Sequence, residues 1–143
     1  MRKLTVLFLT LALGVSSLAA TKKAIQPKGS PTGRPFSPGI LVDGTLYVSG
    51  TTGSDPKTGK IPDEFEAEVK QALENIGGVL KEAGMSFDNA VSVQVYLTDM
   101  ELFSRMNSVY TTYFKEPRPA RTTVGVAKLV GTAHIEITVT AYK

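Results

Sequence analysis

The stretch that decides the fold runs from Pro119 to Tyr142 and reads PARTTVGVAKLVGTAHIEITVTAY. Both halves alternate apolar and polar residues, which predicts two strands that each bury one face, with a turn between them. The first strand is expected to point Val124, Val126 and Leu129 toward the core. The second strand is expected to bury four residues: Ile135, Ile137, Val139 and Ala141.

Two charged residues stand out in this stretch. Arg121 lies just before the first strand, after a proline that cannot continue a helix, and Glu136 lies on the polar face of the second strand. The planar guanidinium of arginine suits bidentate recognition of a carboxylate. From spacing alone, a structural salt bridge is the favoured interpretation, because such pairs are common. A functional site is the alternative.

The amino terminus predicts a secretory signal peptide in residues 1–19, and therefore a secreted or periplasmic protein. Arg2 and Lys3 precede a mostly apolar run, and small residues follow at the cleavage site. The run is too short to cross a bilayer, which takes about 20 apolar residues, so no membrane association is expected after cleavage. Residues 20–34 are expected to form a flexible segment, and residues 35–143 the single folded domain.

The composition excludes several classes of site. The 143 residues carry a formal net charge of +3, two units of which belong to the predicted signal peptide, and no basic stripe favours a nucleic-acid partner. The chain has no cysteine and one histidine, His134, so neither a thiolate nucleophile nor a histidine cluster for a metal can form. No metal and no cofactor are expected. His134 is expected to be an ordinary surface or hydrogen-bonded residue.

The remaining patterns predict the order β-β-α-β-α-β-β. Asp43-Gly44 between two apolar runs indicates a hairpin. Apolar residues at spacings of three and four predict a helix over 65–83, in which the pair Gly77-Gly78 is expected to pack closely against the sheet. Residues 90–97 alternate as a strand, and a capping box at 98–101 opens a second helix. Two helices on one face of a mixed β-sheet make an α+β two-layer sandwich.

Beyond these patterns, the sequence resembles the RidA family (also called YjgF/YER057c/UK114), deaminases that hydrolyse reactive imines and enamines. The resemblance extends from about Lys23 to Ala141. The stretches that carry it are Pro119–Val124 with Val126, Ala127 and Leu129, then Ile135–Ile137 with Ala141, Pro35–Gly39, Tyr47–Gly50, Asp55–Gly59, Met106–Tyr110 and Tyr113-Phe114. Many loosely specific motifs in the right order make the resemblance strong.

The resemblance implies a chorismate-mutase-like homotrimer with cofactor-independent active sites in the clefts between subunits. It implies that Arg121 grips the substrate carboxylate and that Glu136 orients or activates the hydrolytic water. The other substrate-binding positions that it implies are Phe36, Ser49, Gly50, Asn107 and Thr123.

Three positions depart from the family pattern. Phe36 stands where many members have a tyrosine, so the aromatic wall is kept and a hydroxyl is lost. Thr123 stands where many have a cysteine, and Val130 where a proline is usual. The predicted signal peptide is a further departure, because the family's usual substrates arise in the cytoplasm.

The sequence therefore predicts an enzyme that hydrolyses 2-imino or 2-enamino acids carrying a carboxylate to 2-keto acids and ammonia. The alternative is a non-catalytic protein of the same fold that binds a small carboxylate, which Phe36 and the predicted export favour mildly. The ribonuclease or chaperone activity reported for some relatives has no feature behind it here, because neither a basic stripe nor an RNA-stacking motif is present.

Overall fold

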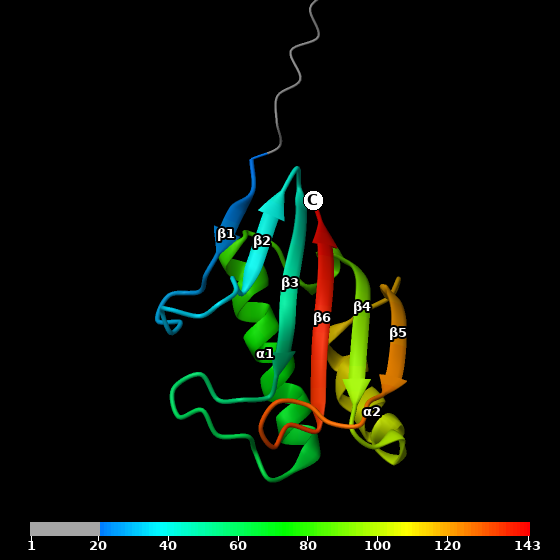
Figure 1. Ribbon diagram of the computed structural model, residues 1–143. Coiled ribbons are helices and arrows are strands. Elements are labelled where there is room, and N and C mark those ends of the chain that lie inside the picture. Colours follow the sequence, from blue (N-terminus) through cyan, green and yellow to red (C-terminus); the bar gives the residue numbers. More distant parts are fainter. Residues whose placement is uncertain (1–20) are drawn as a thin grey trace, which may run out of the picture.

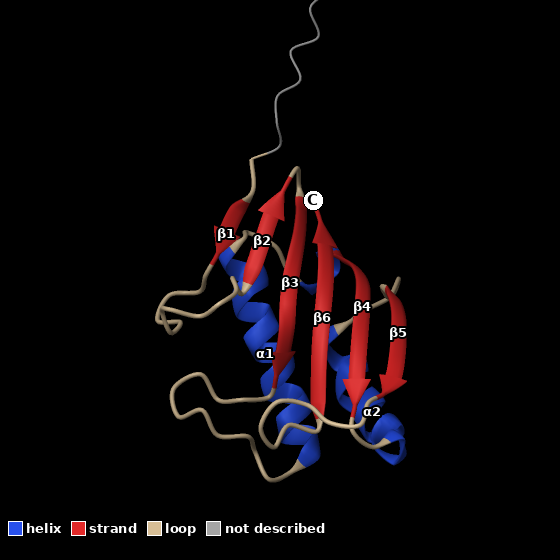
Figure 2. Ribbon diagram, viewed as in Figure 1, coloured by secondary structure: helices blue, strands red, loops and turns tan. Residues whose placement is uncertain are grey.

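The computed structural model describes residues 21–143, so the predicted signal peptide lies outside the described residues. A six-stranded sheet carries two helices on one face, and its other face is left open (Figures 1 and 2). The expected α+β two-layer sandwich with a mixed sheet is thereby confirmed. Among residues 21–143, no helix has the length and apolar character that crossing a membrane requires.

The elements follow the predicted order, with one short strand added at the start. The strands are β1 (Lys23–Ile25), β2 (Gly39–Val42), β3 (Thr45–Thr52), β4 (Ala90–Leu97), β5 (Ala120–Gly125) and β6 (Ile135–Tyr142), and the helices are α1 (Phe65–Glu82) and α2 (Phe103–Tyr113), with short 3-10 turns η1 (Phe87–Asn89) and η2 (Met100–Leu102). Strand β1 lies in the segment expected to be flexible. It pairs with β2 and buries Ile25, and it is too short for its alternation to be recognised in the sequence.

The strand order across the sheet is β1-β2-β3-β6-β4-β5. The last strand in the sequence, β6, thus lies at the centre, between β3 and β4, and β5 forms an edge. All neighbours are antiparallel except β4 and β5, which are parallel. The long alternation that organises the sequence therefore supplies one central strand and one edge strand, separated by β4.

The two halves of the C-terminal stretch differ in how they bury their apolar residues. In β6 the four predicted residues face the helices and are buried, as expected. In β5 the expectation was wrong: Val124 is 41% exposed and faces the open side, while Val126 and Leu129 lie beyond the end of the strand. Arg121 takes the helix-facing position instead, because aromatic rings of α2 cover that side of the edge strand.

Helix α1 packs its predicted apolar stripe against the sheet. The buried stripe consists of Phe65, Val69, Ala72, Leu73, Ile76, Val79 and Leu80. The expectation that Gly77 and Gly78 face the sheet was wrong. A Cβ atom on Gly77 would meet the ring of Phe87 at 3.3 Å, and one on Gly78 would have only Pro27 nearby, at 3.9 Å. Gly78 therefore faces away from the sheet, and Gly77 packs against Phe87 at the flank of the helix.

A buried carboxylate joins the start of α1 to the start of β6. Glu68 is fully buried, and its Oε1 accepts hydrogen bonds from the backbone N–H groups of His134 (2.7 Å) and Ile135 (3.3 Å). Its Oε2 lies 2.8 Å from Nδ1 of His134. His134 is thus a half-exposed, hydrogen-bonded histidine, as expected, and Glu68 satisfies backbone donors that the sheet leaves unpaired.

Replacement of Glu68 by alanine is expected to lower the free energy of unfolding by about 3 kcal/mol, because it leaves buried N–H donors of His134 and Ile135 without an acceptor. Glu68→Gln keeps an acceptor oxygen and should cost about 1 kcal/mol. Urea unfolding curves of both variants and the parent protein measure these differences. A loss below 1 kcal/mol in the alanine variant would contradict the bracing role.

Candidate functional site

Arg121 lies on an aromatic shelf at the edge of the sheet. Its Cζ atom is 4.5 Å from the ring centroid of Tyr110 and 5.7 Å from that of Phe103, both on α2. Among residues 21–143, no carboxylate lies within ion-pair distance of Arg121. Stacking on aromatic faces fixes the plane of a guanidinium without using its N–H donors. Arg121 is therefore held in place and remains available to an anion from outside.

Two further polar groups in this region lack partners. The hydroxyl oxygens of Tyr110 and Thr123 are buried and have no hydrogen-bond partner among the described residues. Burial raises the pKa of the Tyr110 hydroxyl above its ordinary value, although the charge of Arg121 opposes that rise. Both hydroxyl oxygens are inaccessible to solvent, so an external ligand would meet the half-buried Arg121 guanidinium and not these hydroxyls.

Asn107 lies in the same region. It lies four residues after Phe103 and three before Tyr110, and side chains at these spacings share one face of a helix. Arg121 and Thr123 lie opposite the buried residues Val93 and Val95 of β4, so both face the helices. Three of the sequence-predicted residues, Asn107, Arg121 and Thr123, are thus gathered at the α2–β5 edge. We call them the edge cluster.

Glu136 lies on the opposite, open face of the sheet. It is directly across from Tyr96 of β4, and Tyr96 is in turn across from Val124, which is exposed on that face. The salt bridge between Arg121 and Glu136 favoured by spacing alone is therefore wrong. The two residues belong to strands separated by β4, about 10 Å apart at ordinary strand spacing, and they point to opposite sides.

A bulge in β3 lies against the side chain of Glu136. The pairing of β3 with β6 shifts register between Val48 and Thr51, so Ser49 and Gly50 form an irregular step. A Cβ atom on Gly50 would lie 2.9 Å from Cδ of Glu136 and would collide with its carboxylate oxygen. Glycine is thus the residue that lets the Glu136 side chain lie directly on the β3 backbone.

Ser49 and Phe36 lie beside this bulge. The Ser49 hydroxyl donates to the carbonyl of Ser37 (2.7 Å), and the Ser49 N–H donates to the carbonyl of Pro38 (2.9 Å), so β3 holds the loop before β2 in place. That loop presents the ring of Phe36, which is 52% exposed. Phe36, Ser49, Gly50 and Glu136 form the second gathering of predicted residues, the bulge cluster.

One chain does not bring the two clusters together. The edge cluster faces the helices at β5, and the bulge cluster lies at β3 and β6, toward the middle of the sheet. The sequence did not indicate the aromatic shelf, although Tyr110 follows Asn107 by three residues, the spacing at which helical side chains meet. Within residues 21–143, no group of three His, Asp or Glu is arranged to hold a metal ion.

Comparison with known proteins yields one family. The family model described as Endoribonuclease L-PSP matches residues 27–143. A RutC family protein of Aquifex aeolicus is 40% identical over 125 residues, which cover 86% of this chain and 96% of the relative. The 2-iminobutanoate/2-iminopropanoate deaminase of Bos taurus is 44% identical over 124 residues, covering 86% and 87%.

Solved structures give the same result. A Rid family protein of unknown function from Yersinia pestis superposes with a TM-score of 0.81 at 36% identity, covering 86% of this chain and all of that one. Both the sequence and the fold are therefore similar along nearly the whole described part of the chain.

Proposed function

Because the chain belongs to the RidA (YjgF/YER057c/UK114) family, we propose that it is a deaminase that hydrolyses 2-imino and 2-enamino acids to 2-keto acids and ammonia. The deaminase named in the Bos taurus relative, 44% identical, supports this activity. The observation in the structure that carries the proposal is the Arg121 guanidinium, which stacks on two aromatic rings and has no carboxylate partner among residues 21–143. An arginine that is fixed in place but unpaired suits a carboxylate ligand.

The chemistry requires little of the protein. Arg121 binds the substrate carboxylate and brings the C=N carbon next to a water held by Glu136. The water oxygen bonds to that carbon while Glu136 accepts a proton from the water, and the nitrogen takes up a proton. Glu136 then returns its proton to the amino nitrogen of the carbinolamine, the C–N bond breaks to release ammonia, and the hydroxyl gives its proton to solvent as it becomes the keto oxygen. Imines hydrolyse unaided, so positioning and one proton acceptor are sufficient.

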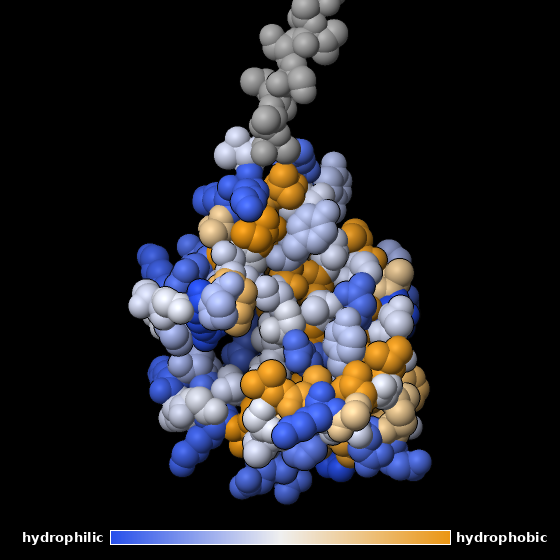
Figure 3. All heavy atoms as spheres, viewed as in Figure 1, coloured by the Kyte–Doolittle hydropathy of each residue, from blue (hydrophilic) through white to orange (hydrophobic). Residues whose placement is uncertain are grey.

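We propose further that the site forms between copies of the chain in a homotrimer. Two observations support this: the edge and bulge clusters each hold part of the required groups, and they lie apart within one chain. The open face also carries large exposed side chains, among them Tyr47 and Val124. Figure 3, which views this face, shows orange apolar patches among the hydrophilic residues. A second copy that covered this face could bring its edge cluster against the bulge cluster of the first.

The proposal is tested by generating 2-iminobutanoate in solution with an amino-acid oxidase and following keto-acid release. The protein with residues 1–19 removed should speed release well above the spontaneous rate, and its native mass should equal three chains. A protein that only bound the carboxylate would leave the rate of release unchanged, and this result would refute the deaminase proposal.

Export is also a proposal, since residues 1–19 lie outside the described residues. It is supported by the basic start and apolar run of that segment. Sequencing the amino terminus of the protein recovered from the periplasm or the medium should give Ala20 as the first residue. An intact Met1 on protein found only in the cytoplasm would overturn it.

A further inference from the structure

A cavity of about 590 Å³ continues from the bulge cluster toward α1. It is lined by the loop before β2, the end of β3, the loop after β3 and the outer side of α1, and Figure 3 shows it as the recess at the left. Phe36, Ser49 and Gly50 belong to its lining. Sites for small ligands commonly have volumes of about 300–1,000 Å³, so this space could hold more of a substrate than its imine carbon and carboxylate.

Side chains of both charges line this cavity, and the cations outnumber the acids. Three cations, Lys28, Arg34 and Lys57, line it, and among residues 21–143 none of them has a carboxylate within ion-pair distance. Two acids, Asp55 and Glu74, also line it. The net charge around the cavity depends on the ionisation and the partners of these two acids.

Both acids already have hydrogen-bond or ion-pair partners within the chain. Oδ1 of Asp55 accepts hydrogen bonds from the backbone N–H groups of Thr58 and Lys57, each at 2.8 Å, and from the Thr58 hydroxyl at 3.2 Å. The two backbone hydrogen bonds, first that from Thr58, hold the pKa of Asp55 below its ordinary value. Glu74 lies 3.8 Å from Lys70 on the same helix. Asp55 therefore stays ionised, and the lining carries three positive charges (Lys28, Arg34 and Lys57) against two negative ones, so the net charge around the cavity is positive.

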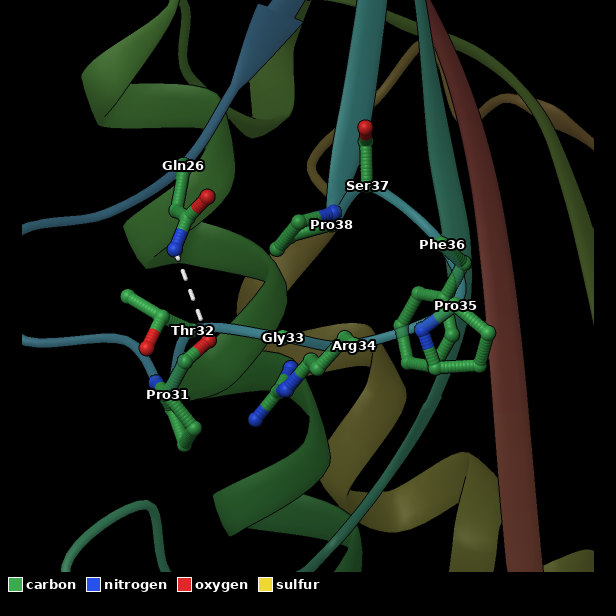
Figure 4. A pocket seen from close by; sticks show the side chains of 9 residues that line it. All are labelled: Gln26, Pro31, Thr32, Gly33, Arg34, Pro35, Phe36, Ser37 and Pro38. Carbon is green, nitrogen blue, oxygen red and sulfur yellow. Dashed lines mark hydrogen bonds between the residues drawn. The ribbon is translucent and has the colours of Figure 1, made fainter.

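Arg34 is the cation that lies over the ring of Phe36, a predicted substrate-binding residue. Its Cζ atom lies 5.7 Å from the ring centroid of Phe36, and it also lines an adjoining cavity of about 330 Å³. Figure 4 shows its guanidinium extending from the loop between the rings of Pro31 and Pro35. Gly33, with a φ of 76°, makes the turn that directs the loop there, and the Gln26 side-chain amide donates to the Pro31 carbonyl at 3.5 Å.

We propose that this cavity recognises a second carboxylate, so that the favoured substrates are 2-imino dicarboxylates, and that Arg34 determines this specificity. This inference rests on the proposed imine hydrolysis. Arg121 would bind the carboxylate next to the imine carbon, and Arg34 would bind the carboxylate at the far end of the substrate, with Lys28 and Lys57 adding to the positive field. A guanidinium binds a carboxylate through two parallel hydrogen bonds, so Arg34 contributes more than charge.

A substrate with one carboxylate would leave these cations without a partner. 2-Iminobutanoate and 2-iminosuccinate have the same number of carbon atoms and differ by the terminal carboxylate, so they separate this contribution from chain length. A charge-assisted hydrogen-bonded pair should favour the dicarboxylate by about tenfold or more in kcat/KM.

The test generates both imines in solution from the corresponding amino acids with amino-acid oxidases and measures keto-acid release. The parent protein should favour 2-iminosuccinate by about tenfold, and Arg34→Gln should abolish this preference while 2-iminobutanoate turnover stays within about twofold. Lys81→Gln is the matched control, because Lys81 is an exposed cation in the last turn of α1, outside both cavities. It removes the same charge and should retain the preference.

Two results would overturn the inference. One is a parent protein that hydrolyses 2-iminobutanoate at least as well as 2-iminosuccinate, and the other is a preference that survives in Arg34→Gln. In both cases the deaminase proposal stands. Failure to speed the hydrolysis of either imine would overturn the deaminase proposal itself and this inference with it. As an independent measurement, the dicarboxylate product 2-oxosuccinate should bind the parent protein at least tenfold more tightly than Arg34→Gln.

Discussion

Replacing Arg121 by alanine should lower kcat/KM for 2-iminobutanoate by roughly a hundred- to a thousandfold, to near the spontaneous rate. The variant loses both hydrogen bonds of the guanidinium fork to the substrate carboxylate, and with them the position of the imine carbon relative to the water. Arg121→Lys keeps the charge but loses the fork, so it should recover only part of the activity. Keto-acid release at saturating and limiting imine measures both variants.

The fold should tolerate this change. No carboxylate in the described part of the chain pairs with Arg121, so alanine removes only the stacking on Tyr110 and Phe103, worth about 1 kcal/mol. The control is Arg118→Ala, three residues earlier, whose guanidinium pairs with Glu116 at the surface. That variant should keep its activity. Parent-like turnover in a folded Arg121→Ala variant would refute the role of Arg121.

Glu136→Gln should lower kcat by about a hundredfold or more with little change in KM. Glutamine preserves the volume and can still hold a water, but it cannot accept the proton that the water must lose. Glu82→Gln provides the control, since Glu82 is an exposed acid at the end of α1. An unchanged kcat in Glu136→Gln would leave the protein without an identified proton acceptor and would contradict the mechanism.

A second variant tests the position of Glu136 by changing Gly50, the residue against which its carboxylate lies. Gly50→Ala keeps every polar group but places a Cβ atom where the Glu136 carboxylate lies, 2.9 Å from its Cδ. The carboxylate must then move, and a displacement of about 1 Å at the reacting group can cost about a hundredfold in rate. The loss in Gly50→Ala should therefore approach that in Glu136→Gln. Full activity would show that the position of Glu136 is unimportant.

The features of the fold that could be predicted from the sequence are local ones. The Asp43-Gly44 hairpin is present, with both residues at positive φ. The apolar stripe of α1 and the alternation of β6 bury the residues expected of them. Strand order depends on contacts between distant parts of the chain, so the sequence did not reveal that β6 is central and β5 an edge. For the same reason, Val124 was expected to be buried.

The candidate site could be predicted only as a set of residues. The strand pattern singled out Arg121 and Glu136 and the family resemblance supplied their roles, but their opposite orientations follow from the strand register, which only the structure gives. The aromatic shelf under Arg121 and the free cations near Phe36 were not foreseen. Aromatic residues at helical spacing normally indicate a core, and charged residues in a loop normally indicate solvent.

The separation of Arg121 and Glu136 within one chain has a genetic consequence. If every active site takes its arginine from one subunit and its glutamate from the next, two inactive proteins should complement each other. Mixing equal amounts of Arg121→Ala and Glu136→Gln chains, by co-expression or by unfolding and refolding together, should restore about a quarter of the parent rate, because each cleft draws its two sides independently. A site contained in a single chain would gain nothing from the mixture.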